Sequence, residues 1–158
     1  MALYHVGERF SREVTFDPHT IHAFAAMAGD HNPLHHDAAF AGRSRFGGVI
    51  ASGAHYGALL MGMVATQLAR DPDTTVAGLE FNLKFRKAVH AGQTMTLEWT
   101  IETKTPAPTL GGELLHLKGH MIDHAGVVYV TTAATCLVMA AQSIHTGPMP
   151  PAQDDNAP

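Results

Sequence analysis

Residues 53–70 read GAHYGALLMGMVATQLAR and form the longest helix candidate in the chain. Apolar residues would lie almost all the way round this helix, which is typical of a helix enclosed by protein. Its small residues would let neighbouring elements approach closely, and Asp71-Pro72-Asp73 ends it. The apolar run over residues 49–65 contains polar residues and falls short of the ~18 residues that a membrane span needs. We therefore expect a buried core helix and no membrane partner.

The segments after this helix change to a period of two. Apolar and polar residues alternate over residues 79–85 and 95–101, and each stretch predicts a half-buried strand. Residues 115–121 continue the alternation, and residues 127–139 predict a fourth strand with little alternation. Residues 104–112 contain Pro and Gly and are expected to be a connector.

The segments before the helix complete the expected fold. Residues 8–16 predict a first strand, and Asp17-Pro18 predicts the cap and first residue of a helix that ends near Gly29. A curved antiparallel sheet is the only large apolar face available to enclose the central helix. We therefore expect an α+β fold in which the sheet wraps around that helix, with one domain over residues 1–141. Residues 142–158 are rich in Pro and Ala and are expected to be disordered.

Composition restricts the possible partners. The chain has 158 residues and a formal charge of −4, so its charge offers no support for nucleic-acid binding. Charged residues make up only 15%, and together with the apolar helix this indicates that a second copy covers some surface, as in a homodimer. The single cysteine, Cys136, can form no internal disulfide, and the first 20 residues do not resemble a secretory signal. We therefore expect a cytoplasmic protein.

A second segment, residues 29–37 (GDHNPLHHD), carries the candidate chemistry. Asp30 and His35 are separated by a turn that contains proline, so their side chains can converge on one small volume. Gly53, at the start of the central helix, can direct a free backbone N–H into that volume. An acid, a base and an oxyanion donor together favour proton chemistry beside a carbonyl group. We expect the neighbouring His31 and His36 to lie at the surface or behind this pair.

These residues carry a resemblance to a known family. The matching segments are residues 24–37, 40–41, 50–53 and 83–92, and the resemblance extends over residues 8–140. The chain resembles the MaoC-like, (R)-specific enoyl-CoA hydratases of the hotdog-fold superfamily. The resemblance implies a hotdog fold and the hydration of trans-2-enoyl-CoA to (R)-3-hydroxyacyl-CoA, or the reverse dehydration. It implies that Asp30 and His35 are the catalytic pair and that the Gly53 amide polarises the thioester carbonyl.

The chemistry of hydration assigns a role to each member of the pair. His35 can deprotonate water near neutral pH, and Asp30 can deliver a proton to the α-carbon if it is protonated. We expect a wall formed by Phe24, Met27 and the central helix to favour the protonated carboxyl group. Both groups would act on one face of the double bond, which predicts syn addition.

Further residues are candidates for contacts with an acyl thioester, the expected small-molecule partner. They are Asn32, Ser52, His55, Arg86 and Lys87. Asn32 can form the turn or contact substrate, and His55 can line the pocket or be satisfied in the core. Arg86 and Lys87 can pair with the phosphates of coenzyme A or form a solvated face. Some relatives have a serine two turns into the central helix, where this chain has Met61.

The sequence leaves two other functions open and offers one candidate metal site. The same fold could hydrolyse acyl-CoA thioesters, or the chain could be a non-catalytic acyl-thioester-binding subunit in which Met61 blocks productive binding. His116, His120 and His124 recur every four residues but fall on a predicted strand, too far apart to share one ion. We therefore expect no metal, and no cofactor apart from the coenzyme A of the substrate.

Overall fold

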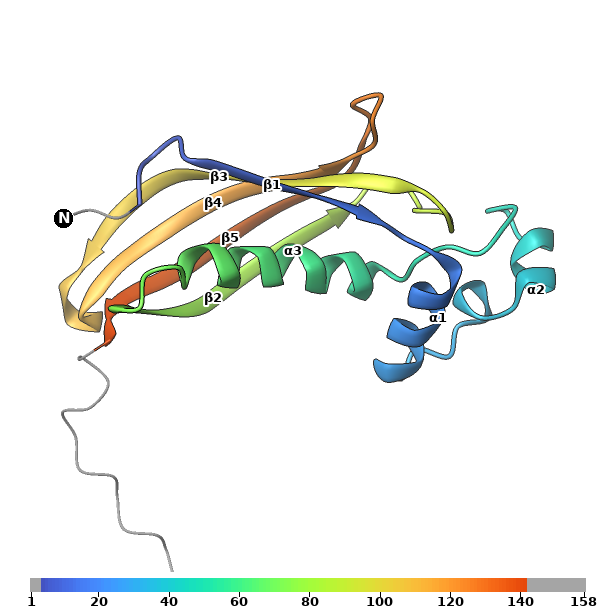
Figure 1. Ribbon diagram of the computed structural model, residues 1–158, viewed down its shortest axis with the longest axis horizontal. Helices are drawn as coiled ribbons and strands as arrows, with labels where there is room; N and C mark the ends of the chain where they lie inside the picture. The colour runs from blue at the N-terminus through green and yellow to red at the C-terminus, as the bar shows by residue number, and fades with distance from the viewer. Residues whose placement is uncertain (1–3, 142–158) are drawn as a thin grey trace, which may run out of the picture.

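A curved antiparallel sheet and one long helix dominate the computed structural model, which describes residues 4–141 (Figure 1). The predicted tail over residues 142–158 lies outside the described residues. The helices are α1 (Pro18–Met27), α2 (Ala38–Arg43) and α3 (Gly53–Leu68), with short 3-10 turns η1 (Pro33–His35) and η2 (Pro108–Leu110). The strands are β1 (Arg9–Thr15), β2 (Thr74–Phe85), β3 (Thr94–Ala107), β4 (Gly112–Ile122) and β5 (Val128–Ala140).

The strands form one sheet in the order β1-β3-β4-β5-β2, and every pairing is antiparallel. The concave face of this sheet holds α3, while α1 and α2 lie beyond the N-terminal end of α3 (Figure 1). The expected antiparallel sheet curved around a central helix is therefore confirmed. No helix among residues 4–141 is long and apolar enough to cross a membrane.

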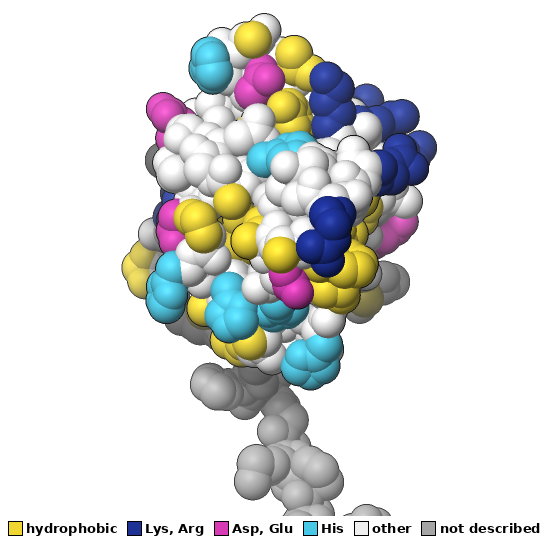
Figure 2. Space-filling view, turned by 90° about the vertical axis from the view of Figure 1, so that its right-hand side faces the viewer, with side chains coloured by type: hydrophobic (Ala, Val, Ile, Leu, Met, Phe, Trp, Pro, Cys, Tyr) yellow, Lys and Arg dark blue, Asp and Glu magenta, His cyan; other side chains and the backbone are white. Residues whose placement is uncertain are grey.

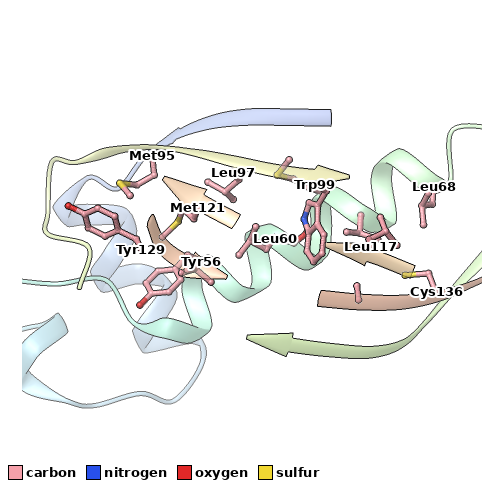
Figure 3. Close-up of a cluster of buried hydrophobic side chains, with 14 of the residues drawn as sticks. Tyr56, Leu60, Leu68, Met95, Leu97, Trp99, Leu117, Met121, Tyr129 and Cys136 are labelled. Carbon is pink, nitrogen blue, oxygen red and sulfur yellow. The ribbon is translucent and has the colours of Figure 1, made fainter. Parts of the chain in front are cut away.

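The core lies between α3 and the inner face of the sheet (Figure 3). The alternation predicted for residues 95–101 is confirmed, because Met95, Leu97, Trp99 and Ile101 on β3 are all fully buried. The indole N–H of Trp99 donates to the Leu60 carbonyl of α3 over 3.0 Å. This bond satisfies the polar atom of the largest buried side chain and anchors the helix to the middle of the sheet.

The predicted connector over residues 104–112 is largely wrong. β3 continues to Ala107, and only η2 and Gly111, with φ of 71°, separate it from β4. β1 pairs with β3 as far as Thr100, and Gly7 and Glu8 bond to Ile101, so within residues 4–141 no strand pairs with this edge of β3 beyond Ile101. Pro106 can occupy that stretch because a proline on a sheet edge removes no ladder hydrogen bond.

The expected enclosure of α3 on all sides is also wrong for the single chain. Leu60, Val64 and Leu68 are buried against the sheet, but Met61 is 41% exposed. The exposed residues of α3 are Ala54, Ala58, Met61, Gly62, Ala65 and Thr66. A single sheet offers one concave face, so it covers one side of the helix and leaves the other open.

The edge strand β2 departs from the predicted half-buried alternation. Phe81 and Leu83 are partly buried and pack on the core, but Leu79 and Phe85 are each 54% exposed. The pairing of β2 with β5 shifts register between Gly78 and Glu80, which leaves Leu79 in a bulge. This edge therefore presents apolar side chains beside the open side of α3.

Candidate active site

Asp30 and His35 converge in the loop between α1 and α2. Gly29, with φ of 72°, follows the end of α1, and the Asp30 N–H donates to the Ala25 carbonyl over 2.8 Å. Asn32 then caps η1, with its Oδ1 accepting from the Leu34 N–H over 3.1 Å. This turn brings His35 Nε2 to 3.3 Å from Asp30 Oδ2.

A main-chain hydrogen bond decides which nitrogen of His35 carries the proton. His35 Nδ1 lies 2.7 Å from the Ile50 carbonyl oxygen. A carbonyl can only accept, so Nδ1 is the donor and the lone pair of the neutral ring is on Nε2. The His35 side chain is only 7% exposed, and its basic nitrogen faces the Asp30 carboxyl group. The pair can therefore hold a proton between them and exchange it with a small molecule.

The surroundings of Asp30 differ from the expected wall. Its Oδ1 accepts from the Asn32 N–H over 3.1 Å, and its side chain is 33% exposed. Met27 is 78% exposed, so the prediction that it forms an apolar wall is wrong. Met27 is the last residue of α1, where no other element of the described chain covers it. Phe24, the other predicted wall residue, stacks on His55.

Gly53 begins α3, so its N–H has no acceptor within that helix. A Cβ at this position would lie 3.0 Å from the Phe85 ring, which explains the glycine. The Ile50 N–H donates to the Leu34 carbonyl over 3.1 Å, three residues before Gly53. The segment that enters α3 is thus bonded to the turn that carries His35. The role of Gly53 as an oxyanion donor stays a prediction.

The remaining candidates take different places. Ser52 is 3% exposed, and its Oγ caps α3 by accepting from the His55 N–H. Arg86 and Lys87 are exposed, and their backbone N–H groups both donate to the Tyr129 carbonyl. No hydrogen bond or ion pair among residues 4–141 joins their side chains to Asp30 or His35. Substrate contacts by these residues and by Asn32 stay predictions.

His55 is buried in an aromatic cluster. Its ring stacks on Phe24, with centroids 4.5 Å apart and an interplanar angle of 5°, and meets Phe16 edge-on at 5.2 Å. Its Nδ1 has no hydrogen-bond partner within residues 4–141. Burial lowers the pKa of His55, against a smaller upward effect of the Asp17 carboxylate. The ring is therefore held neutral beside the start of α3.

His36 lies behind the pair of Asp30 and His35, which is one of the two places expected for it, but the sequence interpretation missed its contact with His22. His36 Nε2 lies 2.6 Å from the Asp30 carbonyl oxygen, and His36 Nδ1 lies 2.8 Å from His22 Nδ1 of α1. The two histidines are fourteen positions apart and belong to a helix and a loop, so no periodic pattern in the sequence indicates this contact. Elsewhere, His116 contacts Thr135 and His120 contacts Glu98. The described part of the chain holds no group of three side chains suited to bind a metal ion.

Comparison with known proteins identifies the family. Residues 5–109 match the family model described as the MaoC like domain. The chain belongs to the MaoC-like dehydratases. A search of curated proteins finds no match.

Solved structures support the same family and its hotdog fold. The (R)-hydratase of A. caviae, involved in PHA biosynthesis, is 26% identical with a TM-score of 0.75, over 86% of this chain and 98% of that one. The R-hydratase PhaJ1 of Pseudomonas aeruginosa, in its unliganded form, is also 26% identical with a TM-score of 0.75, over 95% and 92%. A MaoC-like dehydratase of Rhodospirillum rubrum is 26% identical with a TM-score of 0.73, over 87% and 94%. This chain is therefore a hotdog-fold member of a hydratase and dehydratase family.

The lowered pKa of His55 predicts a pH-dependent contribution to stability. The unfolded chain binds this proton at the ordinary pKa of 6.5, more tightly than the folded chain does. Stability is therefore lost as the pH falls through 6.5 and below. We expect the Tm of the wild type to fall more between pH 7.5 and pH 5.5 than that of His55→Phe, which keeps the aromatic stacking but cannot titrate. Parallel Tm curves for the two proteins, measured by calorimetry, would contradict the buried, neutral ring.

Proposed function

We propose that this protein adds water to trans-2-enoyl-CoA to form (R)-3-hydroxyacyl-CoA, or catalyses the reverse dehydration. The observation that carries the proposal is the 3.3 Å contact between Asp30 Oδ2 and His35 Nε2, with the His35 proton held on Nδ1 by Ile50. The 26% identity to a protein described as an (R)-hydratase supports the same reaction.

The proposed reaction uses this pair as one acid and one base. His35 Nε2 takes a proton from water as the water oxygen bonds to the β-carbon. Electron density moves to the thioester oxygen, which accepts a hydrogen bond from the Gly53 N–H. The reaction requires that Asp30 carries a proton when the substrate is bound, and Asp30 then gives this proton to the α-carbon on the same face. Because Nε2 and Oδ2 are adjacent, the proton on His35 can return to Asp30 and restore the starting state.

Replacement of either member of the pair tests the proposal. We expect Asp30→Asn and His35→Ala each to lower kcat for enoyl-CoA hydration by about 10²- to 10⁴-fold, the usual contribution of a positioned acid or base. The measurement is the loss of enoyl thioester absorbance, with thermal unfolding to show that each variant is folded. The exposed His31→Ala is the matched control and should keep wild-type kcat.

Three results would contradict the assignment. One is near wild-type hydration by either variant of the pair. Release of free thiol from a saturated acyl-CoA, without hydration, would favour the thioesterase alternative. Tight binding of acyl-CoA by the wild type without any turnover would favour a non-catalytic binding subunit.

We also propose that Arg86 and Lys87 bind the phosphates of coenzyme A. Both follow directly after Phe85, whose ring packs against Gly53, so the basic pair is next in sequence to a residue that contacts the start of α3. Lys and Arg side chains gather on one side of the end of the molecule that carries α1 and α2 (Figure 2). A phosphate group there would be recognised by charge-assisted hydrogen bonds.

A carrier comparison tests the phosphate contact. We expect Arg86→Ala combined with Lys87→Ala to raise KM for enoyl-CoA about tenfold, since hydrogen bonds to charged groups contribute about 1.5–3 kcal/mol. KM for the same acyl group on N-acetylcysteamine, which has no phosphate, should not change. Lys118→Ala, on an exposed lysine that pairs with Glu102, serves as the control. An equal rise in KM for both thioesters would exclude phosphate recognition.

We further propose that the protein is a cytoplasmic homodimer. A groove of about 650 Å³ runs between α3 and β2 and is lined mainly by apolar side chains, Met61 and Leu79 among them. It adjoins the unpaired edge of β2, so a second copy could cover the open side of α3 and continue the sheet. The single buried Cys136 suits a reducing compartment.

A charge placed in this groove tests the dimer. We expect the wild type to have twice the chain mass of 16.9 kDa by light scattering, and Met61→Lys to shift it towards the monomer. Val6→Lys, at an apolar residue that is 61% exposed outside the groove, should leave the mass unchanged. A wild-type protein of monomer mass would refute the assignment.

A further inference from the structure

We propose that His36, supported by His22, is a positioning residue that holds Asp30 by its main chain and so sets the reach of its carboxyl group. The proposal rests on the acid role given to Asp30 in the proposed function. It concerns two side chains that take no part in the proton transfers themselves.

Two consecutive imidazoles hold opposite ends of one aspartate. His35 Nε2 lies 3.3 Å from the Asp30 carboxyl oxygen Oδ2, and His36 Nε2 lies 2.6 Å from the Asp30 carbonyl oxygen. The ends of the segment from residue 30 to residue 36 are thus joined twice, once through the side chain of Asp30 and once through its main chain. Any rotation of the Asp30 carbonyl breaks the second contact and moves the carboxyl group relative to His35.

The hydrogen-bond donors determine how His22 takes part. The Asp30 carbonyl can only accept, so His36 Nε2 carries a hydrogen. In the neutral ring His36 Nδ1 is then an acceptor, and His22 Nδ1 must donate across the 2.8 Å contact. If His36 is protonated, the donor and acceptor exchange roles. In either case one proton lies between the two rings, whereas two cationic rings would place two N–H groups face to face.

The contacts connect Asp30 to α1 by two independent routes. The Asp30 N–H bonds directly to the Ala25 carbonyl, and the Asp30 carbonyl reaches α1 through His36 and His22. Asn32 fixes the remaining carboxyl oxygen, Oδ1, through its N–H. Oδ2 alone is left to face His35 and the substrate. A third of this side chain is exposed, so hydrogen bonds add to packing in setting its orientation.

Kinetics of matched variants test the positioning role. We expect His36→Leu to lower kcat for enoyl-CoA about tenfold with less than a twofold change in KM, because small misplacements of reacting groups cost rate. His36→Gln should recover most of the rate, since its amide N–H can replace Nε2–H as donor. His22→Leu should lower kcat in the same direction by a smaller factor. The exposed His31→Leu, whose ring lies 6.4 Å from that of His36, should behave as wild type.

Two outcomes of these kinetics would overturn the proposal. One is a folded His36→Leu variant with wild-type kcat. The other is a His36→Gln variant that is no faster than His36→Leu, which would indicate a general structural loss. If His36→Leu fails to fold, the exposed His22→Leu carries the test alone, and wild-type kcat in that variant refutes the support from α1.

Nitrogen NMR of the histidine rings separates this proposal from the proposed function. We expect the wild type to show hydrogen on His36 Nε2 and a shared proton with His22 that is lost in His22→Leu, whatever the enzyme activity. His36 protonated on Nδ1 alone would refute the positioning role and leave the hydratase assignment untouched. Retained hydration by Asp30→Asn would refute the hydratase assignment and leave the NMR result standing.

Discussion

The hydrogen bond from His35 Nδ1 to the Ile50 carbonyl is the interaction on which the site depends most directly. It joins the turn after α1 to the segment that enters α3, and it fixes the tautomer of His35. The next residue, Ala51, donates to the Val89 carbonyl and so extends the same connection to the segment between β2 and β3. These hydrogen bonds therefore connect His35, the segment that enters α3 and the connection between β2 and β3. A different tautomer would present an N–H to Asp30 instead of a lone pair.

The parts of the fold that sequence predicted are those decided by local pattern. The alternation from Met95 to Ile101 is read correctly because β3 is a central strand with one buried face. The same alternation fails at Leu79, because β2 is an edge strand with a bulge that no local pattern reveals. The apolar circumference of α3 predicts an enclosed helix, but the pattern itself indicates only which faces of the helix are apolar. It does not say whether the chain itself or another molecule covers that face.

The candidate site was likewise predictable only where the local sequence decides the geometry. The convergence of Asp30 and His35 could be predicted from the sequence because a turn that contains Pro33 separates them by only five positions. The environment of Asp30 could not, since the exposure of Met27 depends on which elements pack at the end of α1. His22 and His36 were beyond prediction because their contact joins a helix to a loop through two side chains. The family resemblance implies roles for Asp30, His35 and Gly53, but it does not indicate a contact between His22 and His36.

One feature of the fold explains both the partial exposure of the Asp30 carboxyl group and the exposed side of α3. The five-stranded sheet has a single concave face, and α3 packs on it through Tyr56, Leu60 and Val64. What remains of the helix, and the loop beyond its N-terminus, can be desolvated only by another surface or by the substrate. Desolvation strengthens hydrogen bonds and charge interactions. Because the Asp30 side chain is a third exposed, its interactions would become stronger if another surface or a substrate covered it. In the proposed reaction, His35 and His36 set the geometry of Asp30 before the substrate binds, and the substrate then excludes water from it.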